Sequence, residues 1–160
     1  MDSRADIVRR LYELTEAGAA DDVVAYYADD AVVEVAFQQP ALRGVEEIRS
    51  YLHRVRGSPE VSSELSALRF EEHGDAVLVT GRVRLRDDAQ RSLVDSPGAW
   101  VFRFRGDKVV EVRAFHDTGA ARATLKGDDP RWAPARAPPS PRGARSGAHC
   151  AVIRASSPSA

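Results

Sequence analysis

The sequence predicts an α+β fold in which N-terminal helices pack on a curved antiparallel sheet that encloses a pocket. Two observations lead to this prediction. Apolar residues recur at helical spacing in the first third of the chain, whereas from residue 61 to 116 they alternate with polar residues, as in strands. Turn residues separate the runs. The length of 160 residues suits one domain of ordinary size.

The first predicted helix covers residues 4–17. Ser3 and Asp6 have the spacing of a capping arrangement at its start, and Gly18 is a typical helix end. The apolar face consists of Ile7, Leu11 and Leu14, with Val8 and Tyr12 beside it. This amphipathic pattern predicts a helix that covers a sheet.

A helix–strand–helix unit follows. Residues 20–28 are predicted as a short helix, which Asp29 and Asp30 break. Residues 31–37 are rich in β-branched side chains and predict a strand. A loop with proline and glycine then leads to a third helix over residues 45–56.

Long strands make up the rest of the predicted domain. The strands are expected at residues 61–72, 76–87, 99–105 and 108–116. The polar residues 88–98, which end in Pro97-Gly98, are expected to form a longer hairpin connection. A helix over residues 118–125 closes the domain. Alternation predicts that Val110, Val112, Ala114 and His116 share one face, and that Leu78 lies on the outward face with several arginines.

Composition divides the chain into a domain at residues 1–126 and a tail at residues 127–160. Six of the nine prolines fall between residues 130 and 158, among Ala, Arg, Ser and Gly. Such a segment buries too little apolar surface to compensate for the entropy of ordering it. We therefore expect a solvated, unfolded tail whose arginines are available to an acidic partner.

Composition also excludes several classes of protein. The net charge of −1 gives no bulk electrostatic attraction to nucleic acid or to an anionic membrane. No run approaches the roughly 20 apolar residues of a spanning helix, and the N-terminus has no signal-peptide pattern. A single cysteine, Cys150, excludes an internal disulfide. We expect a cytoplasmic protein with no metal and no cofactor.

Three stretches resemble the nuclear-transport-factor-2-like (NTF2-like) superfamily, and within it the SnoaL-type polyketide-cyclase and ketosteroid-isomerase branch. They are Tyr-Ala-Asp-Asp-Ala-Val-Val-Glu, Arg-Gly-Val-Glu-Glu-Ile-Arg and Phe-Arg-Phe-Arg-Gly-Asp-Lys-Val-Val-Glu-Val-Arg. The resemblance spans residues 5 to about 125. It implies a cystatin-like cone with a small-molecule pocket, on which many unrelated activities occur.

The resemblance also lets known chemistries be tested position by position. The isomerase mechanism uses an aspartate base with a tyrosine and a protonated aspartate that hold an oxyanion. The corresponding positions carry Val35, Leu11 and Trp100, none of which moves a proton. The chain is therefore not expected to be a standard ketosteroid isomerase. An epoxide-hydrolase set would need a carboxylate near Ala114, which is equally absent.

Alternation and the resemblance together predict the site residues. The candidate acid–base pair is His116 with Asp117, because His116 is the inner-face residue that titrates near neutral pH. The alternative is that His116 is a core-edge histidine hydrogen-bonded to the backbone and that Asp117 caps the last helix. The candidate substrate-binding residues are Tyr27, Tyr51, Val83, Trp100, Phe102 and Val112. The alternative for both tyrosines is a core position with a satisfied hydroxyl.

Three further positions bear on the pocket. Gly81 lacks a side chain in mid-strand, which would leave room for a ligand. Glu34 is a possible displaced base, although alternation directs it away from the face of Val35. Gln38 and Gln39 lie near the expected pocket mouth, where they would orient a ligand.

Two functions follow from these features. The first is a cofactor-free acid/base enzyme, of cyclase, isomerase or dehydratase type, that acts on a hydrophobic, oxygenated small molecule. The second is a non-catalytic binding or assembly module of the same fold. In both cases the expected partner is a homodimer mate that docks through the outer face of the sheet.

Overall fold

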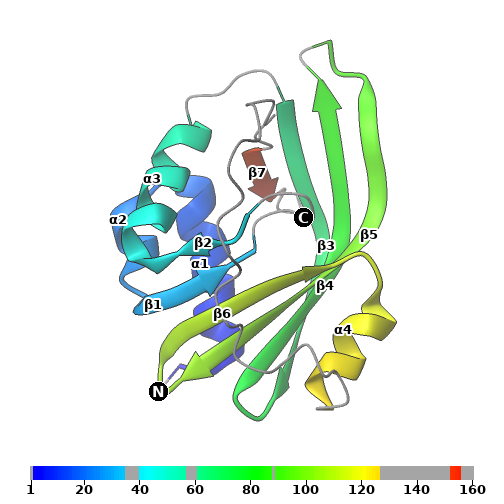
Figure 1. Ribbon diagram of the computed structural model, residues 1–160. Helices are drawn as coiled ribbons and strands as arrows, with labels where there is room; N and C mark the ends of the chain where they lie inside the picture. Colours follow the sequence, from blue (N-terminus) through cyan, green and yellow to red (C-terminus); the bar gives the residue numbers. More distant parts are fainter. Residues whose placement is uncertain (1, 35–39, 57–60, 88, 127–151, 156–160) are drawn as a thin grey trace, which may run out of the picture.

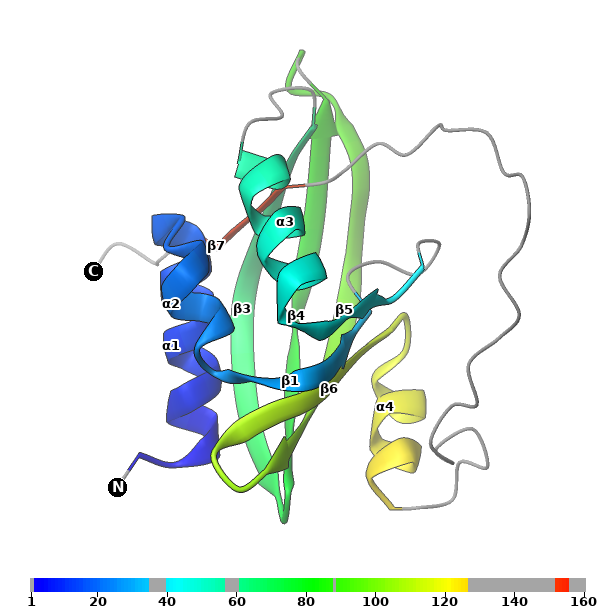
Figure 2. The same cartoon turned by 60° about the vertical axis from the view of Figure 1, so that its left-hand side comes forward.

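Three helices cover one face of the sheet and a fourth lies on the other face (Figures 1 and 2). The structure is a computed structural model that describes residues 2–34, 40–56, 61–87, 89–126 and 152–155. The helices are α1 (Arg4–Ala17), α2 (Ala20–Val24), α3 (Gly44–Arg56) and α4 (Thr118–Leu125). The strands are β1 (Tyr27–Val33), β2 (Leu42–Arg43), β3 (Val61–His73), β4 (Ala76–Asp87), β5 (Ser92–Arg105), β6 (Lys108–Phe115) and β7 (Val152–Ala155).

Helix α1 begins and ends as its sequence predicts. The Ser3 hydroxyl accepts a hydrogen bond from the Asp6 amide at 3.1 Å, and the Asp6 carboxylate accepts one from the Ser3 amide at 3.3 Å. Gly18 ends the helix with a φ of 71°, a left-handed conformation that glycine adopts without strain. The capping box and the glycine stop are confirmed.

The second helix is shorter than predicted. Helix α2 ends at Val24, and β1 already begins at Tyr27, so Asp29 and Asp30 lie within a strand rather than at a helix end. The reason is pairing with β6, a partner distant in sequence. The Val109 amide donates to the Tyr26 carbonyl at 2.9 Å. Pairing of this kind overrides a local helical pattern.

The sheet is mixed rather than antiparallel. Its order is β2-β1-β6-β5-β4-β3-β7, and the pairs β1–β6 and β3–β7 are parallel. The central strands β3 to β6 form the expected antiparallel meander. The predicted α+β cone is confirmed, and the purely antiparallel sheet is corrected.

Strand β5 begins at Ser92, within the segment that the sequence predicts as a connection. Pro97 and Gly98 lie inside this strand and pair with β4. Strand β6 pairs only with the part of β5 from Ala99 onward. Residues 92–98 have no described strand on the side where β6 would pair, so no strand there accepts hydrogen bonds from their amides. A proline is therefore tolerated, as on an edge strand.

Two cores lie on the two faces of the sheet. The inner core, beneath α1 and α3, contains Val8, Leu11, Ile48, Leu65, Val77, Val79, Trp100, Phe102, Phe104, Val109 and Val112, among others. The outer core, beneath α4, contains Ala76, Leu78, Ala99, Val101 and Ala121. Leu78 therefore faces outward as predicted, but α4 covers it, and it is fully buried.

A bulge changes the predicted alternation of β6. Arg103 pairs with Glu111, whereas the next residue, Phe104, pairs with Val109. The extra residue, Val110, has no opposite partner on β5. Val109 consequently enters the inner core in place of Val110.

A short strand lies within the predicted tail. Residues 152–155 form β7 and pair with the edge of β3, which departs from the prediction of an unfolded segment at these positions. The other residues of 127–160 lie outside the described residues. No helix in the described part of the chain is long and apolar enough to cross a membrane.

Candidate functional site

The inner face of the sheet presents aromatic and aliphatic side chains to α1 and α3. The exposed fractions of Trp100, Phe102 and Val112 are 8%, 6% and 4%. Val83 is half-buried and packs against the same core. Four of the six predicted substrate-binding residues therefore come together on one surface, as the alternation of β4 to β6 requires.

The Trp100 ring packs against Gly98, in space that a side chain at residue 98 would occupy. A Cβ atom at residue 98 would lie 2.8 Å from Cη2 of Trp100 and 3.0 Å from Cγ2 of Val83. Both distances are shorter than ordinary contacts, so the indole lies directly over the backbone of Gly98. An aromatic ring packed over a strand glycine in this way is a recognised stabilising arrangement in sheets.

Gly81 does not leave room for a ligand. A Cβ atom there would lie 2.7 Å from Cδ2 of Leu68 and 2.9 Å from the Ser66 carbonyl oxygen. The cause is a bulge in β3 at Ala67, which has a φ of 53° and shifts the register between Ser66 and Arg69. The bulge turns Leu68 toward β4, and the chain itself fills the expected space.

Two tyrosines bring hydroxyl groups into this apolar interior. The ring of Tyr12 packs edge-to-face against Phe70 and Phe102, with centroid distances of 6.0 and 6.1 Å. Burial strongly raises the pKa of Tyr12 and of Tyr27, and the electrostatic influence of Tyr27 raises the pKa of Tyr12 further. Among the described residues, none forms a hydrogen bond with either hydroxyl.

The sequence pattern indicates Tyr27 as a site residue but not Tyr12. The position that corresponds to the family's helix tyrosine is Leu11, which is buried in the core with 3% exposure. The next residue, Tyr12, packs against the inner core from the same helix. Consecutive helix residues are about 100° apart, so an apolar face of that width includes both Leu11 and Tyr12. The width of the face is the sequence feature that indicates Tyr12.

Tyr51 lies on α3, next to Leu52, and is buried. Its exposed fraction is 8%, and the Arg54 guanidinium lies over its ring at 5.8 Å from the centroid. A cation over an aromatic face is favourable and holds the ring in place.

His116 and Asp117 follow the end of β6 and are both exposed. The Asp117 carboxylate accepts hydrogen bonds from the Gly119 amide at 2.9 Å and the Ala120 amide at 3.3 Å. These contacts cap α4, as the alternative interpretation of Asp117 predicts. His116 was expected on the inner face, and the structure places it just beyond the last residue of that strand.

Glu34 brings a carboxylate back to β6. Its amide donates to the Val112 carbonyl at 2.9 Å, and its Oε2 accepts from the Ala114 amide at 3.3 Å. Ala114 lies opposite Trp100 in the β5–β6 pair, so Glu34 ends beside the inner face. Val35, Gln38 and Gln39 lie outside the described residues.

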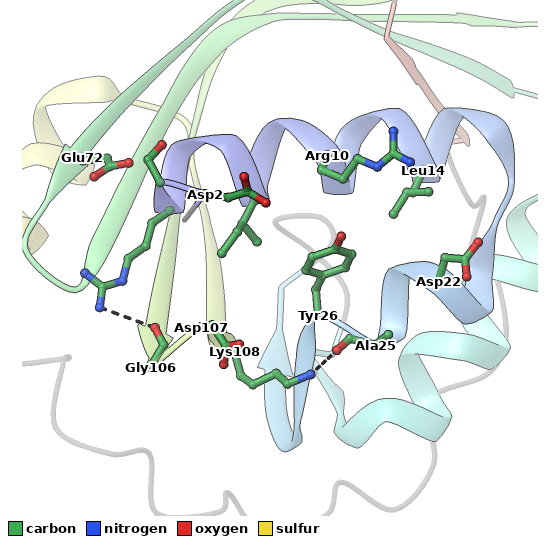
Figure 3. A pocket seen from close by; sticks show the side chains of 13 residues that line it. Asp2, Arg10, Leu14, Asp22, Ala25, Tyr26, Glu72, Gly106, Asp107 and Lys108 are labelled. Carbon is green, nitrogen blue, oxygen red and sulfur yellow. Dashed lines mark hydrogen bonds between the residues drawn. The ribbon is translucent and has the colours of Figure 1, made fainter.

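A concavity of about 1300 Å³ lies outside the inner face, between α1, the end of α2 and the β5–β6 hairpin (Figure 3). Its cations already have partners within the chain. The Arg4 guanidinium donates to the Gly106 carbonyl at 3.4 Å, Lys108 donates to the Ala25 carbonyl, and Arg10 pairs with Glu13. Charges of both signs line the hollow, so it favours no particular ligand.

No three His, Cys, Asp or Glu side chains of the described residues are placed to hold a metal ion.

Solved structures with the same fold come from several bacteria. A candidate polyketide cyclase from Xanthomonas campestris is 20% identical, with a TM-score of 0.59 and coverage of 76% of this chain and 96% of that one. An NTF2-like protein of unknown function from Burkholderia pseudomallei is 22% identical, with a TM-score of 0.61 and coverage of 78% and 98%. An LEH-like epoxide hydrolase from M. tuberculosis is 24% identical, with a TM-score of 0.58 and coverage of 78% and 90%.

These neighbours share the fold of this chain, which is an NTF2-like cone. The model of the SnoaL-like domain family matches residues 8–112, which include most of α1, all of α2 and α3, the strands β1 to β5 and the first part of β6. The matched range contains Tyr12, Tyr27, Glu34 and Trp100 and ends before His116. The chain therefore belongs to the SnoaL-like domain family.

Proposed function

We propose that this chain binds a hydrophobic, oxygen-bearing small molecule at the inner face of its sheet and catalyses a cofactor-free proton transfer on it. The observation that carries the proposal is the pair of partly buried tyrosines, Tyr12 and Tyr27, which pack against the apolar inner core and whose hydroxyls have no hydrogen-bond partner among the described residues. Each hydroxyl has a hydrogen to donate, and a ligand oxygen is a fitting acceptor for it.

The raised pKa values of Tyr12 and Tyr27 suit hydrogen-bond donation rather than base catalysis. Both hydroxyls stay protonated at neutral pH, so they donate hydrogen bonds and do not act as bases. Such donors stabilise negative charge that develops on a ligand oxygen when a neighbouring carbon loses a proton. The reaction types that use this chemistry are cyclisation, isomerisation and dehydration.

The proton acceptor is proposed from two positions. His116, with Asp117, is the pair that the sequence indicates. Glu34 is the second candidate, because its carboxylate lies beside Ala114 at the inner face. The proposed binding residues are Tyr12, Tyr27, Tyr51, Val83, Trp100, Phe102 and Val112. The SnoaL-like family and the cyclase and hydrolase neighbours support a small-molecule role.

The test is a thermal-shift screen of aromatic ketones and polyketide-like phenols, followed by mass spectrometry of each compound that raises the melting temperature. A compound that is recovered chemically changed supports the enzyme. His116→Ala and Glu34→Gln then separate the two acceptors, since loss of a general base lowers turnover about 10²–10⁴-fold. If both variants keep turnover within about threefold of the parent chain, neither residue is the base.

A non-catalytic binding or assembly module is the alternative. The specific observation in its favour is that both oxygens of Asp117 accept bonds from α4 amides, which leaves this carboxylate engaged. A ligand that raises the melting temperature and is recovered unchanged supports this function. We also propose a cytoplasmic location and a homodimer through the outer face of the sheet, where Arg82 and Asp95 form an ion pair beyond the area that α4 covers.

A further inference from the structure

The free edge of β3 accepts a strand from the far end of the chain. Strand β7 pairs with β3 in parallel, with Ser62 opposite Val152 and Leu65 opposite Ala155. As the last strand of the sheet it also contacts α1 (Figure 2). An edge strand presents a row of backbone donors and acceptors that pair readily with an added strand.

The bulge at Ala67 divides the β3 edge into two parts. Beyond the bulge, the N-terminus of α1 contacts the strand, where the Ala5 amide donates to Oε1 of Glu72 at 2.8 Å. Before the bulge, residues 61–66 continue as a regular strand against β4, and β7 pairs with four of them. The acceptor edge is therefore the part of β3 from Val61 to Ser66.

The occupant of this edge is a short strand at the end of a long connection. Four residues form the pairing, and residues 126–151 join β7 to the end of α4 on the opposite face of the sheet (Figure 1). A stretch of this length, fully extended, reaches on the order of 80 Å. The C-terminal strand of one chain can thus reach the β3 edge of another chain as well as its own.

We propose that the β3 edge from Val61 to Ser66 is a strand-acceptor surface, and that its partner is the Val152–Ala155 segment of a second copy of this chain. In the associated form each copy donates its β7 to the other, which gives a closed, two-fold symmetric pair. The same backbone pairing serves both forms, so no new interface chemistry is needed. This contact uses the sheet edge and is independent of the proposed outer-face dimer.

Concentration decides between the two forms. A tethered strand competes with a strand from another molecule at an effective concentration on the order of millimolar. We therefore expect β7 to pair within its own chain in dilute solution, and exchange to become appreciable as the protein approaches that concentration.

The test uses two full-length chains, both carrying Cys150→Ser. One carries Ser63→Cys and the other carries Ile153→Cys, two positions that pair in the structure. Adjacent strands are about 4.8 Å apart, which is within the range that a disulfide spans. The chains are made with different affinity tags, mixed at about 10 µM and about 1 mM, concentrations well below and near the effective concentration, and oxidised mildly. Non-reducing gels then report the mixed dimer.

Exchange predicts a mixed disulfide whose yield rises at least about tenfold between the two concentrations, beyond that of a control pair. The control combines Ile153→Cys with Ser50→Cys, which lies on the exposed side of α3 and measures random collision. A mixed dimer no more abundant than in the control overturns the proposal.

A second measurement avoids the introduced cysteines. Ile153→Pro removes a backbone donor from β7, and Ala148→Pro is the matched substitution outside the strand. Sedimentation at about 1 mM, near the effective concentration of the tethered strand, should show a smaller associated fraction for Ile153→Pro than for Ala148→Pro. Equal fractions contradict strand exchange, and association that persists equally in both variants is the result expected of an outer-face dimer alone.

Discussion

Trp100 occupies the interior because residue 98 has no side chain. The indole lies where a Cβ atom of residue 98 would point, and Val83 approaches the same position. The proposed ligand surface thus depends on a contact between a ring and a backbone. A substitution at Gly98 would leave every aromatic residue in the sequence and would still displace the Trp100 ring.

We predict that Gly98→Ala lowers the free energy of unfolding by about 1–3 kcal/mol, because overpacking forces the indole or Val83 to move. Urea denaturation measures the change. The same substitution in a Trp100→Leu background should cost clearly less, since the clashing ring is gone. Equal costs in the two backgrounds would show that the ring does not lie over Gly98.

Tyr12 offers a cleaner probe of ligand binding. Because no described residue bonds to its hydroxyl, Tyr12→Phe should change the free energy of unfolding by less than about 0.5 kcal/mol, as substitutions that break no specific interaction usually do. Affinity for a ligand found in the screen should fall up to about tenfold, the value of one hydrogen bond. Isothermal titration measures it, with Tyr26→Phe in the outer concavity as control. An unchanged affinity would remove Tyr12 from the site.

Sequence reasoning reached part of this site. Alternation placed Trp100, Phe102 and Val112 correctly because a strand has a fixed period of two. It did not identify the role of Tyr12, since the width of a helix face depends on what packs against it. It also misjudged Gly81, because the bulge that directs Leu68 over it arises from backbone geometry at Ala67.

At the scale of elements, α4 joins the end of β6 to the outer face of the sheet. Asp117 caps its start, and Arg122 forms two hydrogen bonds with Glu71 of β3, at 2.8 and 2.9 Å. Its bounds were predicted correctly from sequence. The helix fixes the position of His116, which directly precedes the cap.

We predict that Asp117→Ala lowers the free energy of unfolding by about 1 kcal/mol, whereas Asp117→Asn leaves it nearly unchanged, because asparagine caps a helix as well as aspartate does. Urea denaturation measures both variants. The Asp117→Asn variant also tests chemistry, since asparagine cannot take up a proton. If this stable variant loses turnover of an identified substrate, the carboxylate has a role beyond the cap.

The elements that the sequence misjudged are those decided by distant partners. The start of β1 at Tyr27 depends on β6, and the early start of β5 at Ser92 depends on β4. Local composition favoured a helix in one case and a loop in the other. Elements governed by their own caps and periodicity, such as α1 and α4, were predicted at their correct bounds.

Across the whole molecule, exposed carboxylates link separate elements and make folding sensitive to acid. Arg122 lowers the pKa of Glu71, the Ala5 amide lowers that of Glu72, and Arg82 lowers that of Asp95. A pKa that is lower in the folded than in the unfolded chain means that the stabilisation is present above the unfolded value. It disappears as the pH falls through the folded value.

We predict that the urea midpoint decreases as the pH is lowered from about 5 to about 3, where these carboxylates take up protons. Glu71→Gln should flatten this decrease, and the exposed Glu16→Gln should leave it as in the parent chain. Added salt should reduce the contribution of the ion pairs by screening. A midpoint that is constant over this range would show that these contacts do not stabilise the fold.

The part of β5 that extends beyond β6 has a consequence for handling the protein. Leu93 and Val94 are 56% and 38% exposed there, on a strand whose outer side has no described neighbour. Such a segment is a template for fibril growth unless its sequence opposes stacking. Asp95 and Pro97 supply that opposition as a charge and a missing backbone donor. Replacement of Asp95 and Pro97 by β-branched residues would remove both obstacles, and this part of β5 would then be expected to nucleate aggregation.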